Sequence, residues 1–235
     1  MARPSDGIQA VVLDLFGTLV AAPRTADRLR AVSLMAGCMD VSPSAVDDAL
    51  TESWPVRHNG QLGNRQAIAS HLAAMCAADQ SAVPVLSDCL RGLAVPRLLA
   101  DQTVLDAVQT LRETGIRVGV LSDVAADVAE AWLGSDLAAR VDAVVFSCRA
   151  GKTKPHPKLY EEVLGQLGTE PSTSVYCGDG GGSELDGARH AGMRAVRVRR
   201  RGGPEALSYG ETAWTGLTIS AVEDLPALLA SGHLR

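Results

Sequence analysis

Short apolar runs alternate with amphipathic stretches through the first residues and the last two thirds of this chain. The apolar runs predict buried strands at residues 8–13, 116–121, 141–146, 175–177 and 193–198. The stretches between them have the spacing of helices at residues 104–113, 125–133, 157–167 and 221–229. A further helix is predicted to follow the glycine-rich turn after residue 177 and to end at residue 191. Strands that alternate with helices predict an α/β fold with a doubly wound parallel sheet.

The segment between the first two strands has a different pattern. It is rich in Ala, Leu and Arg, and turn signals interrupt it at Ser42-Pro43, Trp54-Pro55 and Asn59-Gly60. This composition and the spacing of the turn signals predict a helical insert. We therefore expect a core domain made of residues 1–23 and 95–235, and a helical domain at residues 24–94.

Composition narrows the class of protein. The chain has 235 residues, a net charge of -5 and 46% hydrophobic residues, which suits one core plus a smaller unit. Without a basic stripe we expect no nucleic-acid partner, and we read the run at residues 199–201 as a solvated loop. Without a leader or an apolar span we expect no membrane contact. Five cysteines without a C-x-x-C pair suggest reduced thiols in a cytoplasmic protein.

Polar residues follow the predicted strands. Asp14, Ser122 and Asp179 each come at or just after a strand end, and Lys154 lies in a loop beyond another. The carboxyl ends of parallel strands meet at one crevice, so these side chains should converge there. Such a set suits group transfer through an aspartate nucleophile. Asp14 would attack, Ser122 and Thr18 would hold anionic oxygens, and Lys154 would neutralise charge that develops in the transition state.

Four motifs in order carry a resemblance to a known family. They are D-L-F-G-T-L from Asp14, L-S-D around Ser122, G-K-T-K-P-H-P from Gly151, and G-D-G-G-G-S-E-L-D-G-A-R-H-A-G-M from Gly178. In this order they resemble the haloacid dehalogenase-like hydrolase superfamily, capped subfamily I. The resemblance implies a Rossmann-like core and a helical cap, inserted after the first motif, that covers the active site.

The resemblance also implies a phosphatase that uses Mg²⁺ and forms an aspartyl-phosphate from a small phosphorylated substrate. The metal would be held by Asp14, the backbone oxygen of Phe16 and Asp179. Two carboxylates about 4 Å apart repel by about 4 kcal/mol at an effective dielectric of about 20, which a divalent cation relieves. Glu184 stands where relatives often carry a supporting Asp. It either supports the metal or merely favours a helix N-terminus.

Phe16 departs from the phosphatase pattern, in which an Asp at this position protonates the leaving alcohol. Losing a general acid typically costs about 10²–10⁴-fold in rate. The helical segment could supply another donor, for which the candidates are His58, His71 and Glu52. Alternatively, the leaving group needs no proton, as with an acyl, aryl or diphosphate anion. A third possibility is a slow or non-catalytic relative.

Other residues leave further alternatives open. Asp123 stands where relatives usually carry Asn, and we favour a role for it as a cap of the following helix. Arg57, His58 and Asp123 are candidate substrate contacts, with Arg65 as a further anion binder. Alternatively, these residues have no role in binding substrate, His58 is an exposed loop residue and the arginines are solvated.

Two other functions compete with the phosphatase. The first is a metal-independent 2-haloacid dehalogenase-like hydrolase that forms an aspartyl ester. Phe16 favours it and Asp179 disfavours it, and a cap arginine would bind the halide, with Arg24, Arg28 or Arg30 as candidates. The second is a non-catalytic binding or regulatory protein, and the oligomeric state stays open.

Overall fold

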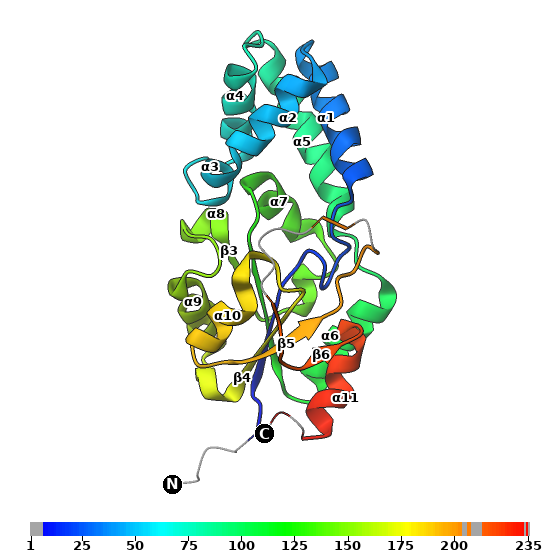
Figure 1. Ribbon diagram of the computed structural model, residues 1–235, viewed down its shortest axis with the longest axis vertical. Helices are drawn as coiled ribbons and strands as arrows, with labels where there is room; N and C mark the ends of the chain where they lie inside the picture. The colour runs from blue at the N-terminus through cyan, green and yellow to red at the C-terminus, as the bar shows by residue number, and fades with distance from the viewer. Residues whose placement is uncertain (1–6, 204–205, 208–212, 233, 235) are drawn as a thin grey trace.

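Six parallel strands form one sheet in the computed structural model, which describes residues 7–203, 206–207, 213–232 and 234. The sheet order is β3-β2-β1-β4-β5-β6, and every neighbouring pair is parallel (Figure 1). The strands are β1 (Ala10–Leu13), β2 (Arg117–Ser122), β3 (Ala143–Phe146), β4 (Ser174–Gly178), β5 (Arg194–Val198) and β6 (Thr218–Ile219). The predicted α/β class with a doubly wound sheet is confirmed.

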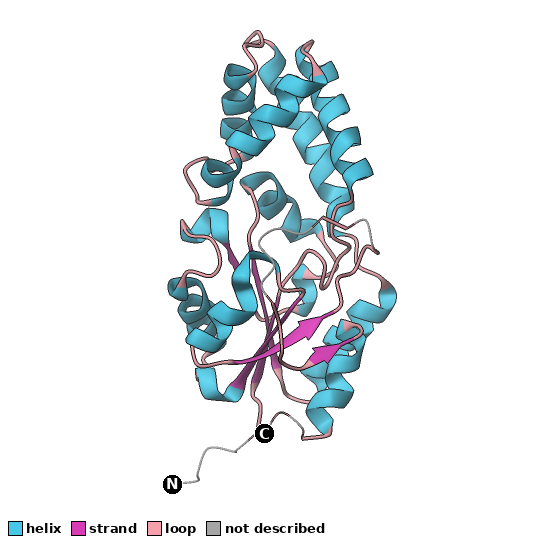
Figure 2. Cartoon of the chain, viewed as in Figure 1, coloured by secondary structure: helices cyan, strands magenta, loops and turns pink. Residues whose placement is uncertain are grey.

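Each face of the sheet has its own hydrophobic core. Val11 and Leu13 of β1 belong to one core, while Ala10 and Val12 belong to the other, because successive strand residues point to opposite faces. Helices α6 (Gln102–Glu113) and α11 (Leu225–Ala230) pack on the first face, and α9 (Pro157–Leu167) and α10 (Glu184–His190) on the second (Figure 2). Burial on both faces explains why the strands appear as continuous apolar runs in the sequence.

Five helices from one continuous segment stand beyond the carboxyl ends of the strands, at the top of Figure 1. They are α1 (Thr25–Met39), α2 (Pro43–Glu52), α3 (Trp54–His58), α4 (Arg65–Met75) and α5 (Ala82–Ala94). The predicted turn signals mark helix limits, since Ser42 caps α2, and α3 begins at Trp54 and has Asn59 as its C-cap. Asn64, which was not among those signals, caps α4 through a bond to a backbone N–H group. Ile68, Leu72 and Leu86 fill the interior of this helical bundle.

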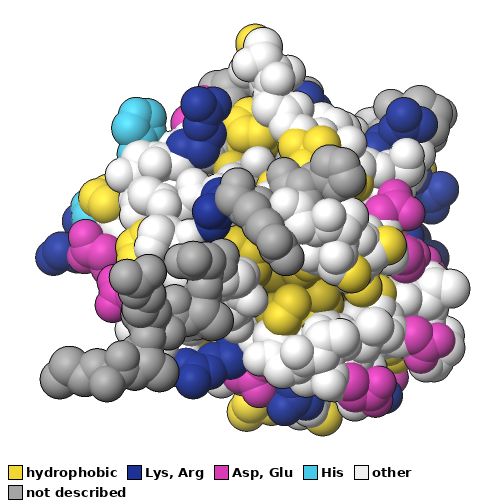
Figure 3. All heavy atoms as spheres, turned by 90° about the horizontal axis from the view of Figure 1, so that it is seen from below, with side chains coloured by type: hydrophobic (Ala, Val, Ile, Leu, Met, Phe, Trp, Pro, Cys, Tyr) yellow, Lys and Arg dark blue, Asp and Glu magenta, His cyan; other side chains and the backbone are white. Residues whose placement is uncertain are grey.

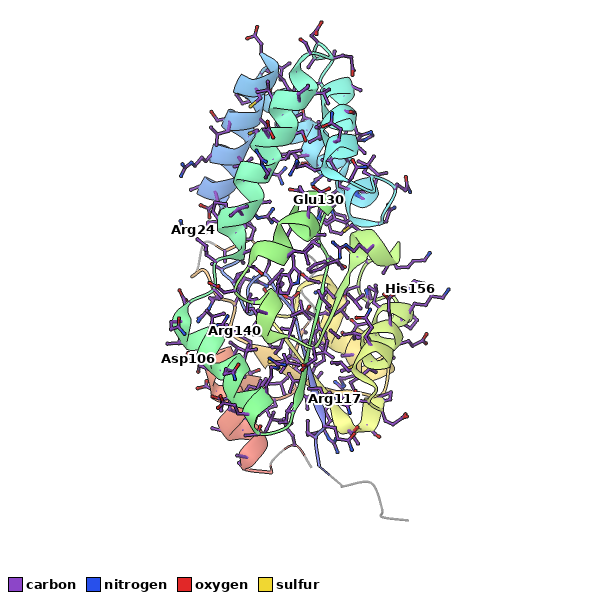
Figure 4. All side chains as sticks on the ribbon, turned by 180° about the vertical axis from the view of Figure 1, so that it is seen from behind. Arg24, Asp106, Arg117, Glu130, Arg140 and His156 are labelled. Atoms are coloured by element: carbon purple, nitrogen blue, oxygen red, sulfur yellow. The ribbon has the colours of Figure 1, made fainter. Side chains whose placement is uncertain are left out.

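An ion pair links the bundle to the sheet domain. The backbone N–H of Arg65 donates to Glu130 Oε1 at 2.8 Å, and its guanidinium lies 3.6 Å from Glu130 Oε2. Figure 4 labels Glu130, a residue of α7 (Ala126–Ala131), at this boundary. Arg65 Nε also donates to Ser87 Oγ at 3.1 Å. These partners hold Arg65 at the junction of bundle and core.

Among the described strands and α-helices of the sheet domain, two short elements were not predicted. They are β6 and the one-turn helix α8 (Ser147–Ala150), which directly follows β3. At the end opposite the bundle, acidic and basic side chains are interspersed around an apolar patch in Figure 3. Among the described residues, no helix has the length and apolar character needed to cross a membrane.

Candidate active site

The strand register brings the predicted site residues to one level of the sheet. Leu13 at the end of β1 pairs with Val120 of β2 on one side and with Cys177 of β4 on the other. Asp14 therefore emerges between the two neighbouring strand ends that carry Ser122 and Asp179. This edge of the sheet faces the helical bundle (Figure 1).

Asp14 lies at the centre of the group and is only 4% exposed. Its Oδ1 accepts from Lys154 Nζ at 2.7 Å and from Ser122 Oγ at 3.4 Å. Its Oδ2 accepts from Thr18 Oγ1 at 3.4 Å. The four residues predicted to carry the chemistry thus meet at one carboxylate.

Lys154 bridges two acids. Its Nζ donates to Asp14 and, at 2.5 Å, to Glu184 Oε2. Burial alone would lower the pKa of Lys154, but the charges of Asp14, Glu184 and Asp123 raise it well above its usual value. Lys154 therefore stays protonated and can stabilise negative charge beside Asp14. Lys152, the other lysine of the motif that begins at Gly151, is exposed.

Glu184 is fully buried although it begins a helix. Its Oε1 accepts from the backbone N–H of Gly180 at 2.9 Å, and its Oε2 accepts from Tyr176 Oη at 2.7 Å. Burial raises the pKa of Glu184 to about 7, against the opposing effect of Lys154. Glu184 therefore contacts side chains of the acidic cluster, Lys154 and Tyr176, and not only a backbone N–H near the start of its helix.

Three carboxylates come close enough to share a cation. Asp14, Asp179 and Glu184 each offer one oxygen, and these oxygens lie within 4.8 Å of one another. Burial, with the charge of Asp179, raises the pKa of Asp14, although Lys154 opposes the shift. A buried set of carboxylate oxygens is the donor set that Mg²⁺ prefers, so these residues fit the metal that the resemblance implies.

Arg200 was missed by sequence reasoning, which placed it in a solvated loop. Its Nε donates to Asp179 Oδ2 at 2.5 Å, and its side chain is only 14% exposed. Nearby, Gly17 has φ +91°, and a Cβ there would overlap the Asp179 carboxylate. The glycine after Phe16 is thus required for both the turn and the close approach of Asp179.

The prediction that Asp123 caps the following helix is wrong. Both of its carboxylate oxygens accept from the backbone N–H of Lys154, at 3.0 and 3.2 Å, and α7 has no side-chain cap. Its carboxylate therefore holds the loop that carries Lys154. A residue 31 positions away supplies the better partner, and local sequence cannot reveal this.

His58 lies in α3 and not in an exposed loop. Its ring stacks on Trp54 with centroids 4.4 Å apart, and its Nδ1 donates to the Trp54 carbonyl oxygen at 2.8 Å. Burial lowers the pKa of His58 to about 3, and the charges of Arg57 and Arg97 act in the same direction. A neutral imidazole is a poor proton donor, so His58 does not suit the role of general acid.

Three of the candidate arginines, Arg57, Arg24 and Arg28, have partners within the helical segment. Arg57 donates from Nε to Ser53 Oγ at 2.9 Å and from Nη2 to the Leu50 carbonyl oxygen at 2.6 Å. Arg24 and Arg28 pair with Asp27 and Asp47.

A different arginine, absent from the sequence-based candidates, approaches Phe16. The Arg97 guanidinium carbon lies 4.6 Å from the centroid of the Phe16 ring. Arg97 belongs to the 3₁₀ turn Val95–Leu98, by which the chain returns from the bundle. Phe16 therefore faces a permanent cation where an acid was expected.

A family model described as haloacid dehalogenase-like hydrolase matches residues 8–192. The chain belongs to the haloacid dehalogenase-like hydrolase family. It is 36% identical over 98 residues to a glyceraldehyde 3-phosphate phosphatase of Methanopyrus kandleri, which covers 41% of this chain and 42% of the relative. The chain spans 18% to 52% of the length of the curated relatives it matches first.

Solved structures of this family share the fold. A 2-haloacid dehalogenase from Pseudomonas syringae pv. Tomato DC3000 superposes with a TM-score of 0.67 at 22% identity, over 96% of this chain and 99% of that one. A HAD family enzyme from Bacteroides thetaiotaomicron, in complex with magnesium and inorganic phosphate, gives a TM-score of 0.65 at 15% identity, over 83% and 96%. At these identities the likeness shows the fold alone, and the chain is a hydrolase by its family.

Proposed function

We propose that this hydrolase is a Mg²⁺-dependent phosphatase of a small phosphorylated molecule. The observation that carries the proposal is the buried set of Asp14, Asp179 and Glu184, whose oxygens lie within 4.8 Å. A hydrolase that displaces halide has no need of the second and third acids. The phosphatase names of relatives such as the Methanopyrus kandleri protein support the same choice.

Each residue has a role in this mechanism. An Asp14 oxygen attacks phosphorus, the bond to the leaving oxygen breaks, and an aspartyl-phosphate forms that water then hydrolyses. Thr18 and Ser122, which donate to Asp14 in the structure, would donate to phosphoryl oxygens. Lys154 would stabilise the charge that grows on them. Mg²⁺, held by Asp14, Asp179, Glu184 and the backbone oxygen of Phe16, would supply further charge neutralisation.

The leaving group departs next to Phe16 in this proposal. Because Phe16 cannot donate a proton and His58 is neutral, leaving groups that are stable as anions suit the site. Arg97, over the Phe16 ring, would stabilise such an anion electrostatically. We also propose that residues 24–94 act as a cap that closes over this edge of the sheet, and that the protein is cytoplasmic.

A metal-independent hydrolase that forms an aspartyl ester to carbon is the second candidate. Phe16 supports it, and so does the pairing of all three acids with Lys154 and Arg200. Such an enzyme would turn over halo-acids in the presence of EDTA.

Hydrolysis of p-nitrophenyl phosphate, measured with Mg²⁺ and with EDTA, tests the proposal. This substrate has a leaving group that needs no proton, so the absence of an acid at Phe16 does not limit it. Turnover that disappears with EDTA is expected. Turnover of a 2-halo-acid in EDTA, without phosphate hydrolysis, would instead establish the second candidate. Inactivity on both classes would point to a non-catalytic relative.

A further inference from the structure

Arg200 forms an ion pair with Asp179, one of the carboxylates of the proposed metal site. Its Nε lies 2.5 Å from Asp179 Oδ2, and the two side chains are only 14% and 8% exposed. A charge-assisted hydrogen bond of this length in a buried setting is stronger than a surface ion pair. Asp179 therefore has a counter-ion supplied by the chain itself.

The backbone holds Arg200 in this place. The next residue, Arg201, donates its N–H to the Gly17 carbonyl oxygen at 2.8 Å and accepts from the Ala22 N–H at 2.9 Å. The segment after β5 is thus bonded to the loop after Asp14 at two places, Gly17 and Ala22. A Cβ on Gly17 would also lie 3.2 Å from Arg200 Cγ, so the glycine leaves room for the arginine.

The charges of the cluster suggest what the pair does. Three of the buried acids, Asp14, Asp179 and Glu184, form ion pairs with two cations, Lys154 and Arg200. Asp123 adds a further negative charge beside Lys154. Lys154 pairs with Asp14 and Glu184, and Arg200 pairs with Asp179, whose Oδ1 also accepts from the backbone N–H of Gly181 at 2.9 Å. A divalent cation at this place must share Asp179 with a guanidinium of like charge, and the repulsion opposes its binding.

We propose that Arg200 is a resident counter-ion that competes with the metal for Asp179 and so sets the Mg²⁺ affinity of the site. Arg200 keeps the acids neutralised when no metal is bound and yields its hydrogen bond to Asp179 when the metal enters. This inference rests on the proposed function only in taking the three acids as the metal site. Arg200 is a positioning residue in this scheme and touches no substrate.

Calorimetric titration of the metal-free protein with Mg²⁺ tests the inference. Arg200→Gln removes the cation, and Arg199→Gln removes an equal charge from the exposed neighbouring side chain. We expect Arg200→Gln to bind Mg²⁺ at least about tenfold more tightly than wild type, and Arg199→Gln to match wild type. We also expect Arg200→Gln to melt at a lower temperature than wild type in EDTA, and Mg²⁺ to remove most of that difference.

Other outcomes separate this inference from the proposed function. If wild type and Arg200→Gln bind Mg²⁺ equally, or the variant binds it more weakly, Arg200 does not compete and only this inference fails. If neither protein binds Mg²⁺, the metal site itself fails and both ideas fall.

A measurement on wild type covers the case in which Arg200→Gln does not fold. The Nε–Hε resonance of Arg200, assigned through its backbone, reports the bond to Asp179. We expect Mg²⁺ to shift it and to speed its exchange with water. A resonance that stays unchanged up to Mg²⁺ saturation would overturn the inference.

Discussion

The imidazole of His58 offers a quantitative test of the electrostatics around the site. The ring stacks on Trp54 and donates from Nδ1 to the Trp54 carbonyl oxygen. Burial, with the charges of Arg57 and Arg97, lowers the pKa of His58 to about 3. Replacing His58 by Gln keeps a polar side chain of similar reach and removes the group that titrates.

The sign and the size follow from proton linkage. An unfolded histidine has a pKa of about 6.5. Between about pH 6.5 and pH 3, His58 is therefore protonated in the unfolded chain but not in the folded protein. The free energy of unfolding therefore falls as the pH falls through this window. Between pH 7.5 and pH 5.0 the linkage loss from this group is about 2 kcal/mol, or about 1–2 kcal/mol after allowance for the partial exposure of the ring.

Urea unfolding at pH 7.5 and pH 5.0 measures this loss. Wild type should lose about 1–2 kcal/mol more than His58→Gln over this interval, whatever constant offset the lost stacking causes. The exposed His190 gives the matched control, since His190→Gln should lose stability in parallel with wild type. If His58→Gln also runs parallel to wild type, folded His58 takes up its proton normally, and its exclusion as a general acid fails.

Three further substitutions address the proposed mechanism. Asp14→Asn should lower p-nitrophenyl phosphate turnover by at least about 10³-fold with an unchanged circular dichroism spectrum, and substantial residual turnover would remove Asp14 as the nucleophile. Lys154→Met leaves the Asp14 and Glu184 carboxylates buried without their shared cation, so urea unfolding at pH 8 should show a loss of about 3–5 kcal/mol; a loss below about 1 kcal/mol would contradict the buried ion pairs. Phe16→Asp should raise the rate on an alkyl phosphate by up to about 10²-fold and change the p-nitrophenyl phosphate rate little; equal effects on both substrates would mean that the missing acid is not the limitation.

The sequence predicted the sheet and the acidic centre well because both depend on local patterns. An apolar run ending in Asp14 defines a strand and a strand end together, and parallel topology brings such ends to one place. The short helix α8 and the strand β6 were missed, since four and two residues are too few to show a period. The limits of the longer α9 were predicted correctly because Pro157 begins it and Gly168 follows it.

The residues that the sequence did not reveal act across long separations. Arg200 meets Asp179 from 21 positions away, and Arg97 approaches Phe16 from another part of the chain. In the sequence the first belongs to a basic run that resembles a solvated loop, and the second lies just after the predicted boundary between the helical domain and the core. Asp123 shows the reverse case, because a helix start lay nearby but the backbone of Lys154 was the partner. Only the packed fold decides between such partners.

The region that matches the family model ends at residue 192, but the folded unit extends further. Beyond it β5 pairs with β4 from Val175 to Gly178, and Val196 and Val198 are almost fully buried. An expression clone cut at residue 192 would leave β4 as an uncovered edge with unpaired N–H and C=O groups, a template for aggregation. It would also remove the backbone bonds between Arg201 and the loop after Asp14. A clone intended for crystallisation or enzymology should therefore run at least through α11.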